Sequence, residues 1–118
     1  MIPHGVEVFV GMEPIDLRWG FDRLAGVASE RLGREPRSGA LFVFFGKRRS
    51  ALKVLFYDGT GMCLFYKRLD QGRFTWPSTQ PTPDGTASIT LTPAQLSMLL
   101  EGLEWRTLVR SRQPMLAG

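Results

Sequence analysis

The sequence predicts an α+β fold, with an antiparallel β-meander sheet of about four to six strands and two amphipathic helices packed on it. Two observations lead to this prediction. Short apolar runs separated by polar turns follow one another between residues 40 and 69, and segments with helical spacing stand on both sides of them. At 118 residues we expect a single domain, with a core over about residues 6–106 and a flexible tail at 107–118.

The N-terminal part predicts a strand followed by a helix. Residues 7–10 have the composition of a short strand, and residues 11–20 form a connection that contains Pro14. Gly33 is suitably placed to end the helix that follows. Its apolar residues recur at helical spacing: Phe21, Leu24, Ala25, Ala28 and Leu32.

The central part predicts the meander itself. Strand-like runs occupy residues 41–45, 52–57 and 62–69. The turns between them, residues 47–50 and 58–61, are each of hairpin length, and the second begins with Asp-Gly, a strong hairpin signal. Antiparallel pairing of the three strands is the expected result.

Four-residue loops predict a register with Phe44 opposite Lys53, and Lys53 opposite Tyr66. The expected core face, interrupted chiefly by Lys67, holds Leu41, Val43, Phe45, Leu52, Val54, Phe56, Cys63, Phe65 and Leu69. The second face holds Phe42, Phe44, Leu55, Met62 and Leu64 together with Lys53, Tyr57, Tyr66 and Arg68. That face is too apolar to be simply solvated, so we expect something to cover part of it.

The C-terminal part predicts two more strands and a helix. Residues 73–76 fit a short strand, residues 77–85 a proline-rich loop, and residues 87–91 a further strand. Thr92 and Gln95 form a capping-box pattern with proline at the first helical position. The apolar stripe of this helix is Leu96, Leu99, Leu100 and Leu103.

Composition excludes several classes of protein. The apolar runs are far shorter than the roughly 20 residues of a membrane-spanning helix, so we expect no contact with a membrane. The first residues lack the pattern of a secretory signal, and the single Cys63 cannot form an internal disulfide. A cytoplasmic protein is the expectation.

The chain carries a net charge of +4, and the excess lies mainly in the meander. Lys47, Arg48 and Arg49 are adjacent in one hairpin turn, where they can reach phosphates without being buried. Tyrosines on the second face could stack on bases; the alternatives are a solvated turn and tyrosines that simply fill a sheet. The candidate nucleic-acid-binding residues are Lys47, Arg48, Arg49, Lys53, Tyr57, Tyr66, Lys67, Arg68 and Arg73.

No residue pattern supports catalysis, a metal site or a cofactor. One histidine, His4, and one cysteine are too few for a zinc site or for a nucleophile with an oriented base. Four carboxylates could converge on metal ions only in a fold that brings them together: Asp16, Asp22, Asp58 and Asp70. Turn formation and helix capping explain Asp58 and Asp22 more simply, so we expect a protein that is not an enzyme.

Several strings closely resemble the TnpB accessory proteins of the insertion-sequence sixty-six group, which are distinct from the RNA-guided nucleases of the same name. The resemblance covers about residues 6–106, and its strings occupy residues 38–44, 53–59, 61–69, 72–77, 91–96 and 99–102. The segment at residues 16–24 is also similar, with departures at Leu17, Trp19, Phe21 and Arg23. The resemblance implies a role in DNA transposition beside a separate transposase that carries the catalytic acids, and it implies no active-site residues.

Two functions follow as hypotheses. The first is an accessory protein that binds DNA at the element ends, or the transposase–DNA complex, through the basic meander. The alternative is a protein-interaction module that does not contact DNA. It would form a homodimer through the second sheet face or dock the transposase.

Overall fold

The computed structural model describes residues 6–75 and 88–105. The strands are β1 (Val8–Gly11), β2 (Leu41–Phe45), β3 (Ala51–Tyr57), β4 (Met62–Arg68) and β5 (Ser88–Leu91), and the helices are α1 (Phe21–Glu30) and α2 (Pro93–Leu100). The α+β prediction is confirmed. The predicted loop at residues 77–85 and the tail at 107–118 lie outside the described residues.

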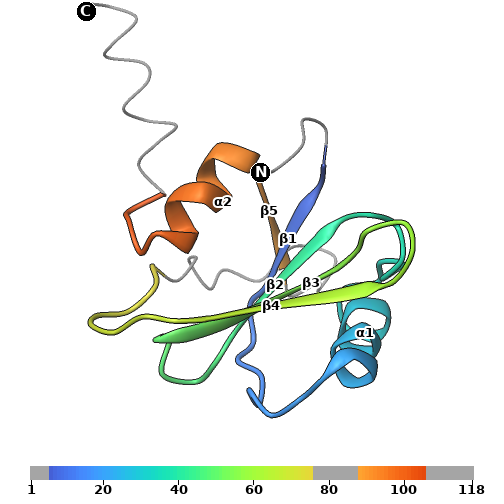
Figure 1. The fold of residues 1–118 in the computed structure, drawn as a ribbon, viewed down its shortest axis with the longest axis horizontal. Helices are drawn as coiled ribbons and strands as arrows, with labels where there is room; N and C mark the ends of the chain where they lie inside the picture. Colours follow the sequence, from blue (N-terminus) through green and yellow to red (C-terminus); the bar gives the residue numbers. More distant parts are fainter. Residues whose placement is uncertain (1–5, 76–87, 106–118) are drawn as a thin grey trace, which may run out of the picture.

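The five strands form one mixed sheet in the order β4-β3-β2-β1-β5 (Figure 1). The predicted meander is present as β2, β3 and β4, paired antiparallel, and β5 pairs antiparallel with β1. The sheet is not antiparallel throughout, because β1 lies parallel to β2. A parallel neighbour requires a long crossover, and here the connection between β1 and β2 contains α1.

The predicted register is confirmed. Phe44 lies opposite Lys53, and Lys53 lies opposite Tyr66. The turn between β3 and β4 is closed by Asp58, whose Oδ1 accepts hydrogen bonds from the backbone N–H groups of Thr60 and Gly61 at 2.9 and 3.0 Å. Gly59 has φ +104°, which a glycine adopts without steric cost. The hairpin turn predicted from Asp58-Gly59 is therefore confirmed.

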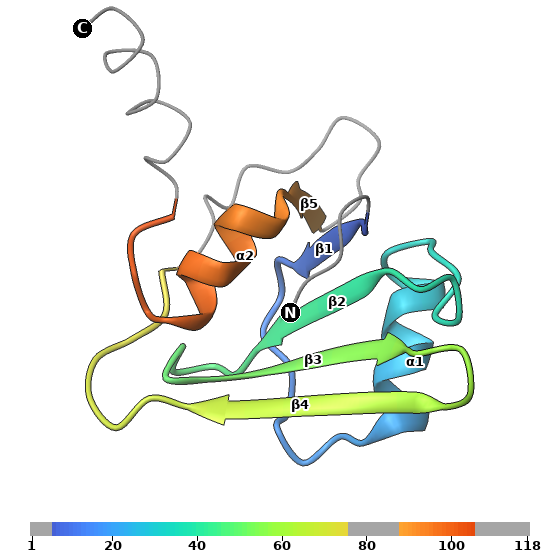
Figure 2. The same ribbon diagram turned by 45° about the horizontal axis from the view of Figure 1, so that its top comes forward.

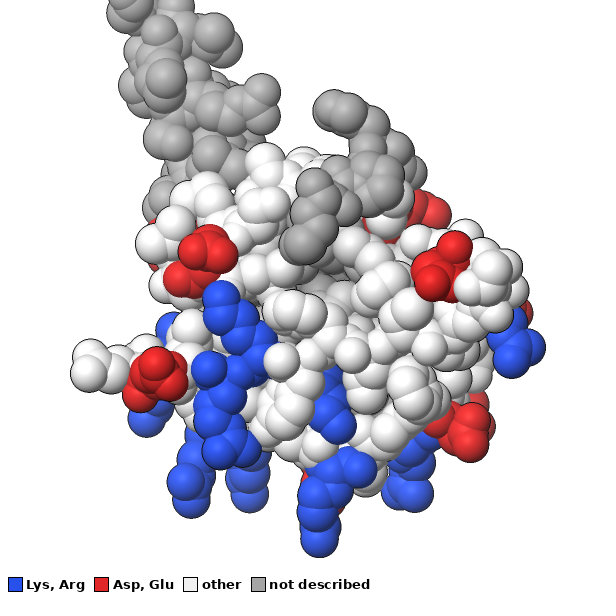
Figure 3. Space-filling view, viewed as in Figure 1, with Lys and Arg blue, Asp and Glu red and all other residues white. Residues whose placement is uncertain are grey.

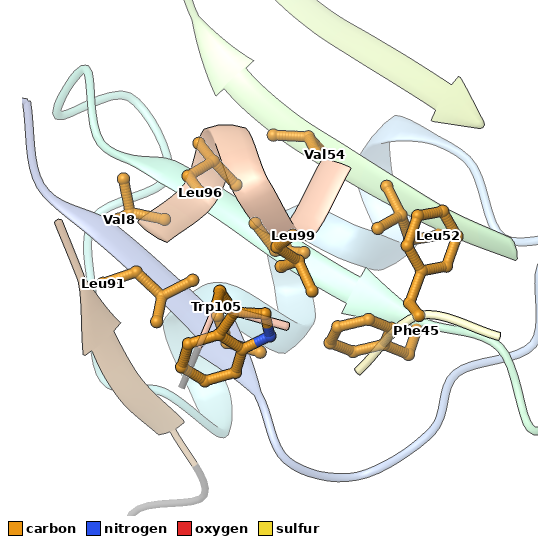
Figure 4. Packing of buried hydrophobic residues seen from close by; sticks show 11 residues of the cluster. Val8, Phe45, Leu52, Val54, Leu91, Leu96, Leu99 and Trp105 are labelled. Carbon is orange, nitrogen blue, oxygen red and sulfur yellow. The ribbon is translucent and has the colours of Figure 1, made fainter. Parts of the chain in front are cut away.

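The two helices cover opposite faces of the sheet, so that the fold has three layers (Figure 2). On the α1 side the buried cluster is Phe9, Ile15, Leu24, Ala28, Leu32, Ala40, Phe42, Phe44 and Leu55. On the α2 side it is Val8, Val10, Val43, Phe45, Leu52, Val54, Phe74, Leu91, Leu96, Leu99 and Trp105, part of which is labelled in Figure 4. The apolar second face of the meander is therefore explained: α1 covers it.

The predicted core face is only partly a core. Val43, Phe45, Leu52 and Val54 are buried, but Phe65 on β4 is 41% exposed. Four others are only half-buried: Leu41, Phe56, Cys63 and Leu69. The helix α2 has eight residues and leaves the β4 part of the face open. Strand alternation predicts which side chains share a face, but the length of the covering helix decides how many of them are buried.

The predicted start of α2 is confirmed, but both helices end earlier than predicted, and α1 ends at Glu30, before Gly33. In α2, Thr92 Oγ1 accepts from Gln95 N at 3.1 Å, and Gln95 Oε1 accepts from Thr92 N at 3.0 Å, so the capping box is present. The helix ends at Leu100, and Leu103 is 52% exposed beyond it, so the stripe is shorter than predicted. No helix within residues 6–75 and 88–105 is long and apolar enough to cross a membrane.

A candidate nucleic-acid interface at one end of the sheet

The turn that joins β2 to β3 carries Lys47, Arg48 and Arg49, all of them exposed. Two backbone hydrogen bonds define its shape, from Gly46 N to Ala51 O and from Arg49 N to Gly46 O, each 3.0 Å long. Because Phe45 and Ala51, the strand residues next to the turn, are buried, the turn begins directly from the rigid core. Three positive charges are thus held at the tip of a well-supported hairpin.

Residues 15–18 lie along one side of this turn. Ile15 forms a parallel bridge with Gly46, and its N–H donates to the Phe45 carbonyl at 2.8 Å. A Cβ on Gly46 would lie 2.6 Å from Leu17 Cδ1, so only glycine lets the two segments approach this closely. The close packing places Asp16 beside the turn.

Asp16 is bound by its own neighbour Arg18. The guanidinium donates from Nε to Oδ1 at 3.0 Å and from Nη2 to Oδ2 at 2.6 Å, and the Arg18 backbone N–H adds a third bond to Oδ1 at 2.9 Å. These hydrogen bonds lower the pKa of Asp16 to about 2 and raise the pKa of Arg18. Asp16 is therefore ionised at neutral pH, and its charge is balanced locally by an arginine that remains 90% exposed.

Residues 69–74 pass along the other side of the turn. Leu69 N donates to Ser50 O at 2.9 Å, and Phe74 N donates to Arg49 O at 2.7 Å. The Phe74 ring is buried against Phe45, with ring centroids 6.2 Å apart. The predicted strand at residues 73–76 is wrong for residues 73–75, which are not in a strand. Phe74 N bonds to the hairpin tip, and Thr75 O accepts from Trp105 Nε1. Trp76 is outside the described part.

Two hollows flank the turn, and both are lined by Lys47, Arg48, Arg49 and Ser50. The first, of about 390 Å³, is completed by residues 15–17, Gly46, Ala51 and Arg68. The second, of about 560 Å³, is completed by Gly72 and Arg73. Lys and Arg side chains gather over this end of the sheet, at the lower left of Figure 3. We call Lys47, Arg48, Arg49, Arg68 and Arg73 the basic end.

Lys53 is placed differently from the sequence-based prediction. Its side chain is 7% exposed, and its Nζ donates to the Trp19 carbonyl at 2.8 Å and lies 5.3 Å from the centre of the Tyr66 ring. Because α1 and the segment before it cover this face, Lys53 has little surface left for a nucleic acid. Its position opposite Phe44 was predictable, whereas its burial was not.

Of the remaining candidates, Tyr66 and Arg68 lie beside Lys53, whereas Tyr57 and Lys67 lie elsewhere. Tyr66 is 47% exposed, and its hydroxyl accepts from Arg68 Nη2 at 2.9 Å. Tyr57 stands at the opposite end of the sheet and donates to Gly59 O at 3.0 Å. Lys67 points to the α2 side, where its Nζ donates to Leu100 O at 2.7 Å, close to the negative end of the helix dipole. The basic-aromatic face is thus divided between different parts of the fold.

The structure also contains an apolar hollow that the sequence did not indicate. It has a volume of about 460 Å³ and lies where α2 leaves the β3–β4 face open. It is lined by Val6, Gly39, Leu41, Val54, Phe56, Tyr57, Asp58, Phe65, Leu96 and Leu100. Strand alternation predicted that Phe65 lies on the α2 side of β4. Its position in the wall of a hollow follows from the shortness of α2, which the sequence did not predict.

Acidic residues do not converge in the described part of the chain. No group of three or more His, Cys, Asp or Glu side chains there could hold a metal ion. Asp58 is used by its turn, where the N–H of Thr60, then that of Gly61, lowers its pKa to about 2. Burial and the neighbouring Asp58 raise the pKa of the Cys63 thiol, which disfavours the nucleophilic thiolate.

The scaffold and the basic end define a small three-layer α+β protein that presents cations at one end of its sheet. The chain belongs to the family described as IS66 Orf2 like protein, whose family model matches residues 6–110. The family resemblance predicted from the sequence strings is confirmed. Membership indicates an accessory role in transposition of an insertion sequence.

Two relatives come from Sinorhizobium fredii (strain NBRC 101917 / NGR234). The chain is 47% identical over 108 residues to "Uncharacterized protein y4hO", an alignment that covers 90% of each chain. It is 34% identical over 107 residues to "Uncharacterized protein y4jC", covering 91% of this chain and 87% of the relative. No solved structure matches the chain.

Proposed function

We propose that this chain acts in transposition by binding DNA through its basic end. The observation that supports the proposal is the gathering of five exposed cations, from three separate segments, around two adjoining hollows. Cations at such positions neutralise phosphates and release the counterions of the duplex, which is the main source of affinity for DNA.

The electrostatic surroundings support this proposal. Asp16 is the one acid among the described residues that line the two hollows, and Arg18 already neutralises it. Lys47, Arg48 and Arg73 make no ion pair with another described residue, so their charge is available to a ligand. If the turn were simply solvated, there would be no reason for two further segments to bring Arg68 and Arg73 beside it.

The residues proposed here to contact DNA are fewer than the nine candidates predicted from the sequence. Lys53 and Lys67 hold parts of the fold together through the carbonyls of Trp19 and Leu100, and Tyr57 lies at the other end of the sheet. We therefore assign DNA contact to the basic end alone.

Salt dependence of DNA affinity tests the proposal. Fluorescence anisotropy with a labelled duplex of an element end should give a dissociation constant that rises steeply with salt. The K47Q/R48Q/R49Q variant should lower the slope of log affinity against log salt by about two to three units. A salt-insensitive affinity, or no binding, would contradict the proposal.

A charge-matched control separates this site from general positive charge. The R31Q/R34Q/R37Q variant removes three cations at the end of α1 and in the loop before β2, none of which lines either hollow. Its slope should stay close to that of the unmodified chain. An equal loss in both variants would mean that DNA does not select the basic end.

The alternative function, contact with another protein through the second sheet face, has lost the observation that motivated it. Phe42, Phe44 and Leu55 are fully buried under α1, so they need no second copy and no transposase to cover them. Light scattering at high protein concentration checks this. A dimer that is still present in the K47Q/R48Q/R49Q variant would favour the alternative.

A further inference from the structure

We infer that the β2–β3 turn enters a groove of double-stranded DNA, and that the two hollows beside it receive phosphates from opposite strands. This inference rests on the proposed DNA binding and specifies its substrate as duplex DNA. It is derived from the arrangement of the flanking cations, and not from their number.

The cations stand on both sides of the hairpin ribbon. Arg68 shares the α1 side of the sheet with Tyr66 and completes the first hollow together with Asp16. Arg73 precedes Phe74, which belongs to the α2-side cluster, and completes the second hollow. Each hollow beside the tip therefore has its own arginine, and the two hollows share Lys47 and Arg48.

This arrangement matches the major groove. Two neighbouring strands lie about 4.8 Å apart, and the major groove of B-DNA is about 12 Å wide and admits a two-stranded β-ribbon. A row of phosphates borders each side of the groove. A tip placed between the rows would bring one row to each hollow.

A single strand fits the basic end less well. Proteins that bind single strands combine a basic groove with aromatic rings on which the bases stack. No aromatic side chain is found among the lining residues of either hollow within residues 6–75 and 88–105. The nearby Tyr66 lies with Lys53 over its ring and Arg68 on its hydroxyl, so its polar contacts are already made within the protein.

The flanks are also fixed before any ligand arrives. Ile15 N bonds to Phe45 O on one side, while Leu69 N and Phe74 N bond to Ser50 O and Arg49 O on the other. A preformed site loses less conformational freedom on binding, which favours a ligand of regular shape such as a duplex.

The first test compares a 16-base-pair duplex with each of its single strands at equal salt. We expect affinity for the duplex to be at least ten-fold higher. Methyl green, which occupies the major groove, should compete with the protein, whereas netropsin, which occupies the minor groove, should not. Equal or tighter binding of a single strand, or competition by netropsin alone, would overturn the inference and leave DNA binding intact; no binding of either DNA form would contradict the proposed function itself.

The second test asks whether Arg68 and Arg73 contact different strands. R68Q and R73Q should each lower the salt slope by about one unit, and the double variant by about two. Duplexes with uncharged methylphosphonates on one strand should abolish the effect of one substitution and preserve that of the other, and the pattern should reverse when the other strand is modified. Both arginines responding to the same strand would overturn the inference. Both arginines are exposed, so circular dichroism of each variant should show an unchanged fold.

Discussion

The ammonium of Lys53 donates a 2.8 Å hydrogen bond to the carbonyl oxygen of Trp19, which is 34 residues earlier in the chain. The bond joins the middle of the sheet to the residue just before the N-cap of α1. Lys53, which the sequence suggested as a DNA contact, therefore anchors the segment that lies beside the basic end.

Replacing Lys53 should therefore affect stability and not DNA affinity. Lys53→Met leaves the Trp19 carbonyl without its donor and should lower the free energy of unfolding by about 1–3 kcal/mol in urea titrations. Lys47→Met, on the exposed turn, should change it by less than about 0.5 kcal/mol. For the salt slope of DNA binding the expected order is the reverse: a loss of about one unit for Lys47→Met and none for Lys53→Met. A slope that falls with Lys53→Met would return this lysine to the interface.

Removing the acid from the first hollow should strengthen DNA binding. Asp16→Asn takes away a negative charge near Lys47 and Arg68 and releases Arg18 for a phosphate. We expect about two- to five-fold tighter binding at low salt and a slope increased by up to about one unit. Glu13→Gln is the matched control. It removes the same negative charge from a carboxylate that also contacts an arginine, Arg31, but does not line the first hollow. Unchanged or weaker binding by Asp16→Asn, with its fold intact, would count against phosphate entry into this hollow.

Asp58 should make the protein sensitive to acid. Its pKa in the folded chain is about 2, below the ordinary value of 3.8, because backbone N–H groups bind the carboxylate. A lowered pKa stabilises the fold fully above about pH 4, and this contribution is lost as the pH falls toward 2. Asp58→Asn should therefore lower Tm at pH 7 and have a smaller effect at pH 2. A difference in Tm that does not shrink with acid would mean that the turn does not depend on the ionised carboxylate.

Trp105 should be required for the segment that carries Arg73. Its indole N–H donates to Thr75 O at 2.9 Å, and its ring is buried in the α2-side cluster. Trp105→Phe leaves that carbonyl unpaired and should cost about 1–3 kcal/mol in the free energy of unfolding. Leu103→Ala, two residues earlier and half exposed, should cost less than about 0.5 kcal/mol. Equal costs would show that the indole hydrogen bond is unimportant.

Local patterns predicted much of the fold because they act over a few residues. Strand alternation and hairpin length placed Phe44, Lys53 and Tyr66 in one row across three strands, and the Thr92–Gln95 capping box marked the start of α2. The departures have a common cause. The parallel pairing of β1, the exposure of Phe65 and the course of residues 73–75 all depend on contacts between segments far apart in the chain.

The candidate site shows the same division between local and distant contacts. The sequence by itself determined the meander, its register and the three cations at its tip, because these follow from side-chain alternation and from residues adjacent in the chain. Only the tertiary structure decided which other cations join them. Packing of α1 buries Lys53, and the carbonyl at the end of α2 binds Lys67, while hydrogen bonds from residues 69 and 74 to the turn bring Arg73 beside Arg48. Burial and hydrogen bonding across the fold select which charges remain for a ligand, and no local pattern of residues encodes that selection.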